Sequence, residues 1–397
     1  MSTVLVGGGP AGLGLLVAAA RTGALDALLD DGLTVIDAGQ ATGFGGGRLS
    51  GYLVRSDTRA RVFAECVTPV LSSDTPDGLL ARCDRDEPVP LPVAAALLAA
   101  AGQRVLDRVR AHPRTVVHSA GRVTGLRTGE NGVILRVAGG PTVRAGRAAL
   151  TVGGRPWIPP GLPAGGRPVL HSEQVLRERG YRDLIARLGG DVPRVTVVGG
   201  SHSAFAVAGL LLRAPVQWAP GAITIAHRSP VLVTYPDTAT ARADGVEVDA
   251  DQVCPVTGVV HRFGGLRSDA AAVYQRVRRG TERRIRLVPV PDGWGWFPDV
   301  ARDDPVVVAA TGYRSAVSSL LEGADGEVRW DAEGRLRTDA GRVLPHLYGL
   351  GLGTCRPRGP RTGGEPAFSG AIDGVWFYQN VVAPDLLDLM LADGSRG

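Results

Sequence analysis

Hydrophobic residues near the N-terminus form two short runs, separated by a glycine-rich turn and a longer apolar segment. Thr3–Val6 is apolar and β-branched and predicts a buried strand, and Leu33–Ile36 predicts a second one. Between them, Leu13–Ala20 is apolar on every face, which is typical of a buried helix. The order of strand, glycine turn, helix and strand predicts a βαβ unit with parallel strands.

The turn after the first strand carries the pattern G-x-G-x-x-G at Gly7, Gly9 and Gly12. In dinucleotide-binding units the first glycine permits the tight turn, the second lets the backbone approach a pyrophosphate, and the third lets helix and strand pack closely. Amides at the helix start, around Pro10 and Ala11, would hold the phosphates. Asp37 ends the second strand, where a carboxylate binds ribose hydroxyls and disfavours a 2′-phosphate. The pattern predicts FAD or NAD here; the alternative is a glycine-rich turn without a ligand.

A second unit of the same kind follows further along the chain. Its strand, turn, helix and second strand are predicted at 194–198, 199–204, 205–212 and 222–226. Ser201 and Ala204 replace two of the three glycines, and His227 with Arg228 stands where the first unit has its acid. An arginine there suits the 2′-phosphate of NADPH; the alternative is a solvated arginine at a strand end. The expected NADPH contacts are Gly199, Ser201, His202, Ser203, His227 and Arg228.

Composition excludes several classes of protein. The 397 residues contain no lysine, so all 44 basic residues are arginines, and a P-loop, a kinase or a lysine Schiff base is ruled out. The net charge of +5 comes from arginines scattered among acids, which predicts no nucleic-acid surface. The four cysteines and seven histidines show no zinc-site spacing, so no metal is expected. No run of about 20 apolar residues and no signal sequence is present, which predicts no membrane span and a cytoplasmic location.

Three further segments carry a resemblance to a known family. Thr151–Pro156 resembles the A-T-G-x-x-P segment by which the chain leaves an FAD domain, and Ala310–Tyr313 resembles the A-T-G-Y segment by which it returns. Gly200–Ala204 resembles the G-x-S-A part of an NADPH-binding turn. The chain thus resembles the flavoproteins with two dinucleotide-binding domains, and among them the flavin-containing and the lysine or ornithine N-hydroxylating monooxygenases. It lacks the C-x-x-C dithiol of the disulfide reductases that share this fold.

The resemblance implies an α/β fold with two Rossmann-like dinucleotide-binding domains, the NADPH domain being inserted in the FAD domain. The FAD domain is expected at residues 1–165 and 305–397, the NADPH domain at 190–304 and a connector at 166–189. It also implies that a C-terminal helix, predicted at Val375–Val382 and started by Pro366 and Ser369, points its N-terminus at the flavin. Further expected contacts are Gln40, Arg48, Gly153, Gly351 and Ser369 for FAD and Tyr313 for NADPH.

Five glycines between Gly43 and Gly51 predict a loop whose backbone packs closely against a neighbour. The polar residues in and after this loop are candidate flavin or substrate contacts, namely Arg48, Tyr52, Ser56 and Asp57. No catalytic acid or base is assigned, because a bound flavin would carry the chemistry itself. All four cysteines are expected to be reduced and structural.

The resemblance implies a hydride transfer from NADPH to FAD, then addition of O2 to give a C4a-hydroperoxyflavin. This species oxygenates a soft nucleophile, for which an amine is the expected choice, held as a small molecule or on a carrier protein. The first alternative is an NADPH-dependent flavin oxidoreductase or oxidase without a stable hydroperoxide. The second is a protein that holds FAD without catalysing a reaction.

Overall fold

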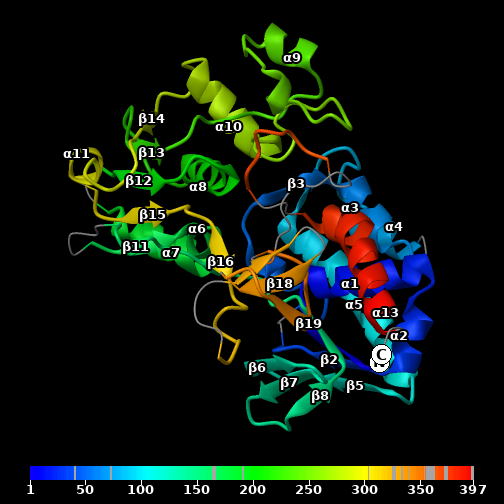
Figure 1. Ribbon diagram of the computed structural model, residues 1–397. Coiled ribbons are helices and arrows are strands. Elements are labelled where there is room, and N and C mark those ends of the chain that lie inside the picture. Colours follow the sequence, from blue (N-terminus) through cyan, green and yellow to red (C-terminus); the bar gives the residue numbers. More distant parts are fainter. Residues whose placement is uncertain are drawn as a thin grey trace.

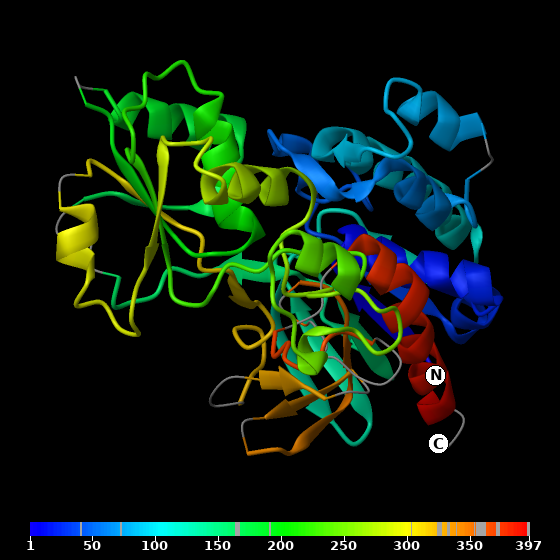
Figure 2. The ribbon, with the colours of Figure 1, turned by 90° about the horizontal axis from the view of Figure 1, so that it is seen from above.

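Two sheets with parallel strands organise the protein, and each belongs to a different unit of the chain (Figure 1). The computed structural model describes all residues except 40–41, 72–73, 163–166, 190–191, 303, 324–327, 332–333, 339, 353, 355–362, 371–373 and 395–397. Figure 2 shows the second unit, in green and yellow, beside the first. The mixed α/β class expected from the sequence is confirmed.

The first sheet has seven strands in the order β17-β18-β19-β9-β1-β2-β5. Their bounds, in that order, are Val328–Trp330, Arg335–Thr338, Val343–Gly349, Arg147–Leu150, Thr3–Val6, Leu33–Ile36 and Thr115–His118. The five strands from β19 to β5 are parallel, and β17 and β18 extend one edge in antiparallel fashion. β1 and β2 have the bounds predicted from the sequence, and Val6 pairs with Ile36.

Helices cover one face of this sheet and a small antiparallel sheet covers the other. The helices are α1 (Pro10–Thr22), α2 (Leu25–Asp31), α5 (Leu91–Ala111) and α13 (Ala383–Gly394), whose apolar side chains share one core with β1 and β2. On the other face lie β6 (Val123–Gly129), β7 (Gly132–Val137) and β8 (Val143–Ala145). Proline at the first position of α1 and a left-handed Gly23 after its last fix the ends of this helix.

The second sheet has five parallel strands in the order β11-β15-β12-β13-β14. Their bounds, in that order, are Val169–His171, Val307–Ala309, Val195–Val198, Ile223–His227 and Ile285–Pro289. Its helices are α6 (Ser172–Val175), α7 (Glu178–Arg187), α8 (His202–Leu212), α10 (Ser268–Arg278) and α11 (Phe297–Ala301). Side chains from α6, α7, α8 and α10 form a core with these strands, separate from the core of the first unit.

The strand pairing changes the boundaries expected between the units. Residues 166–189 are not a mere connector, because β11 joins the second sheet and α6 and α7 pack in its core. Likewise β15, expected in the first unit, pairs between β11 and β12. The chain crosses between the units at a two-stranded ribbon of β10 (Gly154–Pro156) and β16 (Tyr313–Ser315), so the two segments that carry the family resemblance lie side by side.

The remaining elements are short and lie outside the two large sheets. They are the 3₁₀ turns Leu49–Gly51 and Ala250–Gln252, the strands β3 (Arg55–Arg59) and β4 (Pro88–Pro90), and the helices α3 (Ala60–Val67), α4 (Asp74–Leu80), α9 (Thr238–Ala243) and α12 (Val375–Phe377), which continues through a π-helical turn (Tyr378–Val382) into α13. Among the described residues, α1 and α2, bent by 111°, would reach the length and apolarity of a membrane span only if taken together, and no helix does so by itself.

Candidate functional site

The glycine turn of the first unit leaves an open space at the start of α1. Gly7 has φ +111°, and a Cβ on it would lie 2.4 Å from the carbonyl oxygen of Thr151, so only glycine fits there. By contrast, a Cβ on Gly9 would meet no atom within 4 Å. The space in front of Gly9 is therefore open. An anion such as a pyrophosphate could enter it and approach the backbone amides at the helix start.

Asp37 follows β2 and is buried directly beside this turn. A Cβ on Gly8 would lie 2.4 Å from the Asp37 Cγ, which shows how closely the carboxylate approaches the turn. Burial raises the pKa of Asp37, and the N–H groups of Gly8, Gly39 and Ala38 offset this effect only in part. Asp37 thus lies at the end of β2 beside the glycine turn, and its contact with a ribose stays a prediction.

A raised pKa in the folded state means that ionised Asp37 costs folding free energy. At mildly acidic pH the folded protein binds more protons at Asp37 than the unfolded chain does. The stability that Asp37 contributes is therefore complete below the pKa of the unfolded carboxyl, and it is lost as the pH rises through the higher pKa of the folded one. We expect Asp37→Asn to raise the melting temperature of the FAD-free protein at pH 7 but not below the ordinary pKa of aspartate. FAD affinity should fall by roughly 10- to 100-fold, the loss of one charge-assisted hydrogen bond. Calorimetric melting over a pH series and flavin titration measure the two effects; a lower melting temperature at pH 7 would contradict the role of burial.

The glycine-rich loop and the predicted FAD contact Gly351 also reach the start of α1. The N–H of Gly45 donates to the carbonyl oxygen of Gly8 at 2.7 Å, which confirms that the glycine-rich loop packs closely against backbone. Gly47 and Gly351 border Pro10 and Ala11, respectively, at distances that leave no room for a side chain. Gly153 lies at the start of the crossing ribbon, with open space where its Cβ would be.

In the C-terminal segment, the predicted start of the helix differs from the structure, and the predicted FAD contact of Ser369 is not tested. The helix begins at Val375 after Gly374, so Pro366 and Ser369 do not start it, because a turn and residues 371–373 intervene. Ser369 is exposed, and its part in FAD binding stays a prediction. Gln40 lies outside the described residues.

The turn of the second unit has the same close backbone approach as that of the first, although two of its three glycines are replaced. Gly199 has φ +138°, and a Cβ there would lie 2.3 Å from the carbonyl oxygen of Ala310, as for Gly7 and Thr151. Ser201 precedes the first residue of α8 without capping it. The His202 Nε2 accepts a hydrogen bond from the backbone N–H of Arg267 at 3.0 Å, and burial lowers the pKa of His202. His202 therefore binds the loop before α10.

Strand register corrects which residue corresponds to Asp37. Val6 pairs with Ile36 in the first unit and Val198 with Ala226 in the second, so His227, not Arg228, occupies the equivalent place. The Cβ of His227 lies against Gly200 as Asp37 lies against Gly8. Arg228 is the next residue, 74% exposed, with Asp292 as an exposed partner at 3.4 Å.

Residues predicted separately for flavin and NADPH meet in one cluster between the units, which we call the hinge cluster: Arg48, Tyr52, Glu173, Arg177 and Tyr313. The buried Glu173 carboxylate lies 3.3 Å from Arg48 and 2.9 Å from Arg177, and the Arg177 guanidinium stacks over the Tyr52 ring. Burial raises the pKa of Tyr313, and the nearby Tyr52 and Glu173 raise it further. Sequence reasoning missed Glu173 and Arg177, since neither belongs to a motif and only the docking of α6 and α7 brings them here.

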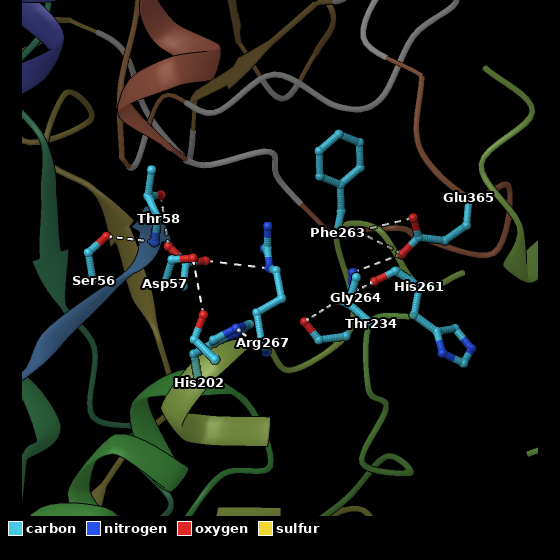
Figure 3. Close-up of polar contacts among 12 residues, drawn as sticks. Ser56, Asp57, Thr58, His202, Thr234, His261, Phe263, Gly264, Arg267 and Glu365 are labelled. Atoms are coloured by element: carbon cyan, nitrogen blue, oxygen red, sulfur yellow. Dashed lines mark hydrogen bonds and ion pairs between the residues drawn. The ribbon is translucent and has the colours of Figure 1, made fainter. Parts of the chain in front are cut away.

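Ser56 and Asp57 lie on β3 and face the second unit. Asp57 pairs with Arg267 at 3.4 Å, and its backbone oxygen accepts from the Ser268 hydroxyl (Figure 3). Beside it, Arg55 forms a two-bond ion pair with Asp269, its Nε lying 3.0 Å from the carboxylate. A cavity of about 390 Å³ opens between β3, α8 and α10, and Tyr52, Ser56, Asp57, His202 and Ser203 all line it. This volume is within the range of small-molecule sites.

The segment between Cys254 and Arg267 is held against the C-terminal segment. The buried Glu365 carboxylate accepts from the N–H groups of Phe263 and Gly264 at 2.8–3.1 Å (Figure 3). Burial opposes ionisation of Cys254, but hydrogen bonds from Thr257, Arg262 and Gly364 outweigh it and lower its pKa to about 6. The hydrogen bonds around Cys254 thus favour its thiolate form, whereas burial raises the pKa of Cys66 to about 12. Among the described residues, no group of three or more metal-ligating side chains is present.

Comparison with known proteins gives one extended sequence match and many structural ones. No protein-family model matches the sequence. The CMP-5′-(3-aminopropyl)phosphonate hydroxylase of Streptomyces rubellomurinus is 34% identical over 437 aligned positions, which cover 99% of this chain and 98% of that protein.

Two solved structures illustrate the shared fold. The flavin-containing monooxygenase of Stenotrophomonas maltophilia is 16% identical with a TM-score of 0.56, covering 99% of this chain and 98% of that one. The ornithine N-hydroxylase of Kutzneria sp. 744 is 15% identical with a TM-score of 0.57, covering 99% of both chains. The chain therefore belongs to the family of the Streptomyces hydroxylase and has the fold of the flavin-containing and N-hydroxylating monooxygenases.

Proposed function

We propose that the chain is an FAD- and NADPH-dependent monooxygenase that hydroxylates a primary amine. The observation that carries this proposal is the pair of glycine turns with opposite charge at the ends of their second strands. The buried Asp37 carboxylate suits the ribose hydroxyls of FAD, whereas His227 and Arg228 suit the 2′-phosphate of NADPH.

We assign the nucleotides to the units that the two sheets define. FAD would bind the first unit at Gly7, Gly9, Gly12 and Asp37, with Arg48, Gly153 and Gly351 around it. NADPH would bind the second unit, which runs from β11 to β15, at Gly199, Ser201, Ser203, His227 and Arg228. Tyr313 would lie between them, because β16 belongs to the ribbon that joins the units.

A flavin held at the glycine turn of the first unit would supply the redox chemistry by which NADPH and O2 oxygenate the substrate. The balanced reaction is R–NH2 + O2 + NADPH + H⁺ → R–NHOH + NADP⁺ + H2O. The chain would orient the reactants and exclude water. In the hinge cluster, Tyr313 stays protonated because its pKa is raised, so its hydroxyl can donate a hydrogen bond, and Glu173 offsets the charges of Arg48 and Arg177.

The choice of an amine is supported by the name of the Streptomyces relative, whose substrate carries a 3-aminopropyl group. That amine is joined through a phosphonate to CMP. We therefore favour an amine carried on a nucleotide over one carried on a protein.

The experiment that tests this function measures NADPH consumption and hydrogen peroxide release with and without CMP-5′-(3-aminopropyl)phosphonate. We expect the compound to accelerate NADPH consumption and to suppress peroxide release, with a hydroxylamine as product. If peroxide still accounts for all the NADPH consumed when the compound is present, the protein is an NADPH oxidase toward this compound and the proposal is wrong.

A further inference from the structure

The cavity between the units lies along α8. His202, the first residue of α8, and Arg213, its C-terminal cap, both line it. Its volume is about 390 Å³. Between the ends the walls are mainly apolar, with Val54, Leu91, Leu176, Phe205 and Val273. We call this space the α8 cavity.

The end of the α8 cavity beside His202, which we call its inner end, holds the ion pair of Asp57 with Arg267. Tyr52 of the hinge cluster and Gly374, which precedes the C-terminal helix, both line it. Asp57 lies here, 38% exposed, and its ion pair with Arg267 is long at 3.4 Å (Figure 3). The neighbouring His202 favours the neutral form, since burial lowers its pKa. An ammonium group can therefore approach the Asp57 carboxylate.

The outer end carries an available positive charge. Arg213 is exposed, and among the described residues no ion-pair partner is found for it. Its Nη1 lies 3.9 Å from the position of a Cβ on Gly209, so the guanidinium folds back along α8 over the cavity wall. The carboxylate of the nearby Asp269 already accepts hydrogen bonds from Nε and Nη2 of Arg55. The charged side chains that line the cavity are Arg55, Arg213, Arg267, Asp57 and Asp269. Their net charge is positive, and Arg213 is the arginine without an ion-pair partner among the described residues, which favours an anion at the outer end.

We propose that the α8 cavity binds the substrate lengthwise, with its amine at Asp57 and its phosphonate or phosphate group at Arg213. The occupant is an amine joined through a short apolar chain to an anionic phosphorus group. The nucleotide beyond that group projects toward the surface. This inference rests on the proposed amine hydroxylation, and it adds the site, the orientation and the charge of the far end.

The test uses the FAD-loaded enzyme with three variants and two ligands. Arg213→Ala removes the outer charge, and Arg104→Ala, on the exposed side of α5, is its control. Gly209→Leu fills the cavity midway; it should fold, because a Cβ there would meet only Val273 at 3.4 Å and Arg213 at 3.9 Å, and leucine favours a helix over glycine. Gly78→Leu, on the exposed α4, controls for the added side chain. The ligands are CMP-5′-(3-aminopropyl)phosphonate and propylamine, which has no phosphorus group, and calorimetric affinities are measured besides KM.

We expect Arg213→Ala to weaken binding of the phosphonate roughly 10- to 100-fold, the effect of one charge-assisted contact, and to leave propylamine and the KM for NADPH unchanged. Gly209→Leu should abolish phosphonate binding while NADPH still reduces the flavin. Wild-type affinities in both variants would overturn the inference even if the enzyme hydroxylates the amine, whereas absence of hydroxylation by the wild type would instead refute the proposed function. A rise in the KM for NADPH in either variant would assign the cavity to the dinucleotide and overturn the inference.

Discussion

Gly9→Leu is expected to yield a folded protein that does not retain FAD. Gly9 precedes α1 with φ −82° and ψ −170°, a conformation open to any residue, and no atom lies within 4 Å of its Cβ position. The leucine side chain would fill the space that a pyrophosphate must enter and would separate it from the amides of the helix start. Loss of two charge-assisted hydrogen bonds, about 1.5–3 kcal/mol each, would lower FAD affinity by roughly 100- to 10,000-fold.

The measurement is a flavin titration of the FAD-free protein, with its melting temperature as the check on folding. Replacing glycine by leucine before a helix costs roughly 1 kcal/mol or less, so the melting temperature should change little. Gly7→Ala is the contrasting variant: its φ of +111° and its contact with Thr151 predict loss of the fold itself. FAD binding by Gly9→Leu at wild-type strength would place the flavin elsewhere.

Arg228→Ala is expected to remove most of the preference for NADPH over NADH. The guanidinium can form two charge-assisted bonds to the 2′-phosphate, which NADH lacks. Because Arg228 is largely exposed and pairs with Asp292 only at 3.4 Å, it is available to a ligand. The KM for NADPH should rise by roughly 10- to 100-fold and that for NADH should stay unchanged, as measured by anaerobic flavin reduction.

Two companion variants make this prediction specific. Asp292→Asn releases Arg228 from its partner and should lower the KM for NADPH slightly. His227→Asp restores an acid at the place equivalent to Asp37 and should repel the 2′-phosphate, so that NADH becomes the better donor. An equal loss with both nucleotides in Arg228→Ala would indicate a contact with the pyrophosphate or a structural role.

The parts of the fold that could be predicted from the sequence are those encoded within one stretch of chain. Thr3–Val6, the glycine turn and Leu33–Ile36 are contiguous, and each follows from its own residues, so their bounds were correct. The second sheet was only partly predicted, since β11 is three residues long and is recognisable as a strand only through its pairing with β15, and this pairing also assigns β15 to the second unit. The sequence placed both His227 and Arg228 where the first unit has Asp37, and the strand register shows that His227 is the counterpart.

The candidate site shows the same limit. Arg48, Tyr52 and Asp57 could be singled out because they follow a glycine-rich loop, but their partners Glu173, Arg177 and Arg267 come from parts of the chain more than a hundred residues away. Arg213 carries no sequence signal among 44 arginines; only its place at the end of α8 makes it a candidate. The low pKa of Cys254 likewise depends on Gly364 and Arg262, which the fold brings to it.

The central claim is that this protein transfers an oxygen atom from O2 to an amine. The most direct measurement is mass spectrometry of the product formed from CMP-5′-(3-aminopropyl)phosphonate under ¹⁸O2 with NADPH. The account predicts a hydroxylamine that contains one ¹⁸O atom for each NADPH consumed. Unchanged amine together with labelled hydrogen peroxide, or a product whose oxygen comes from water, would contradict it.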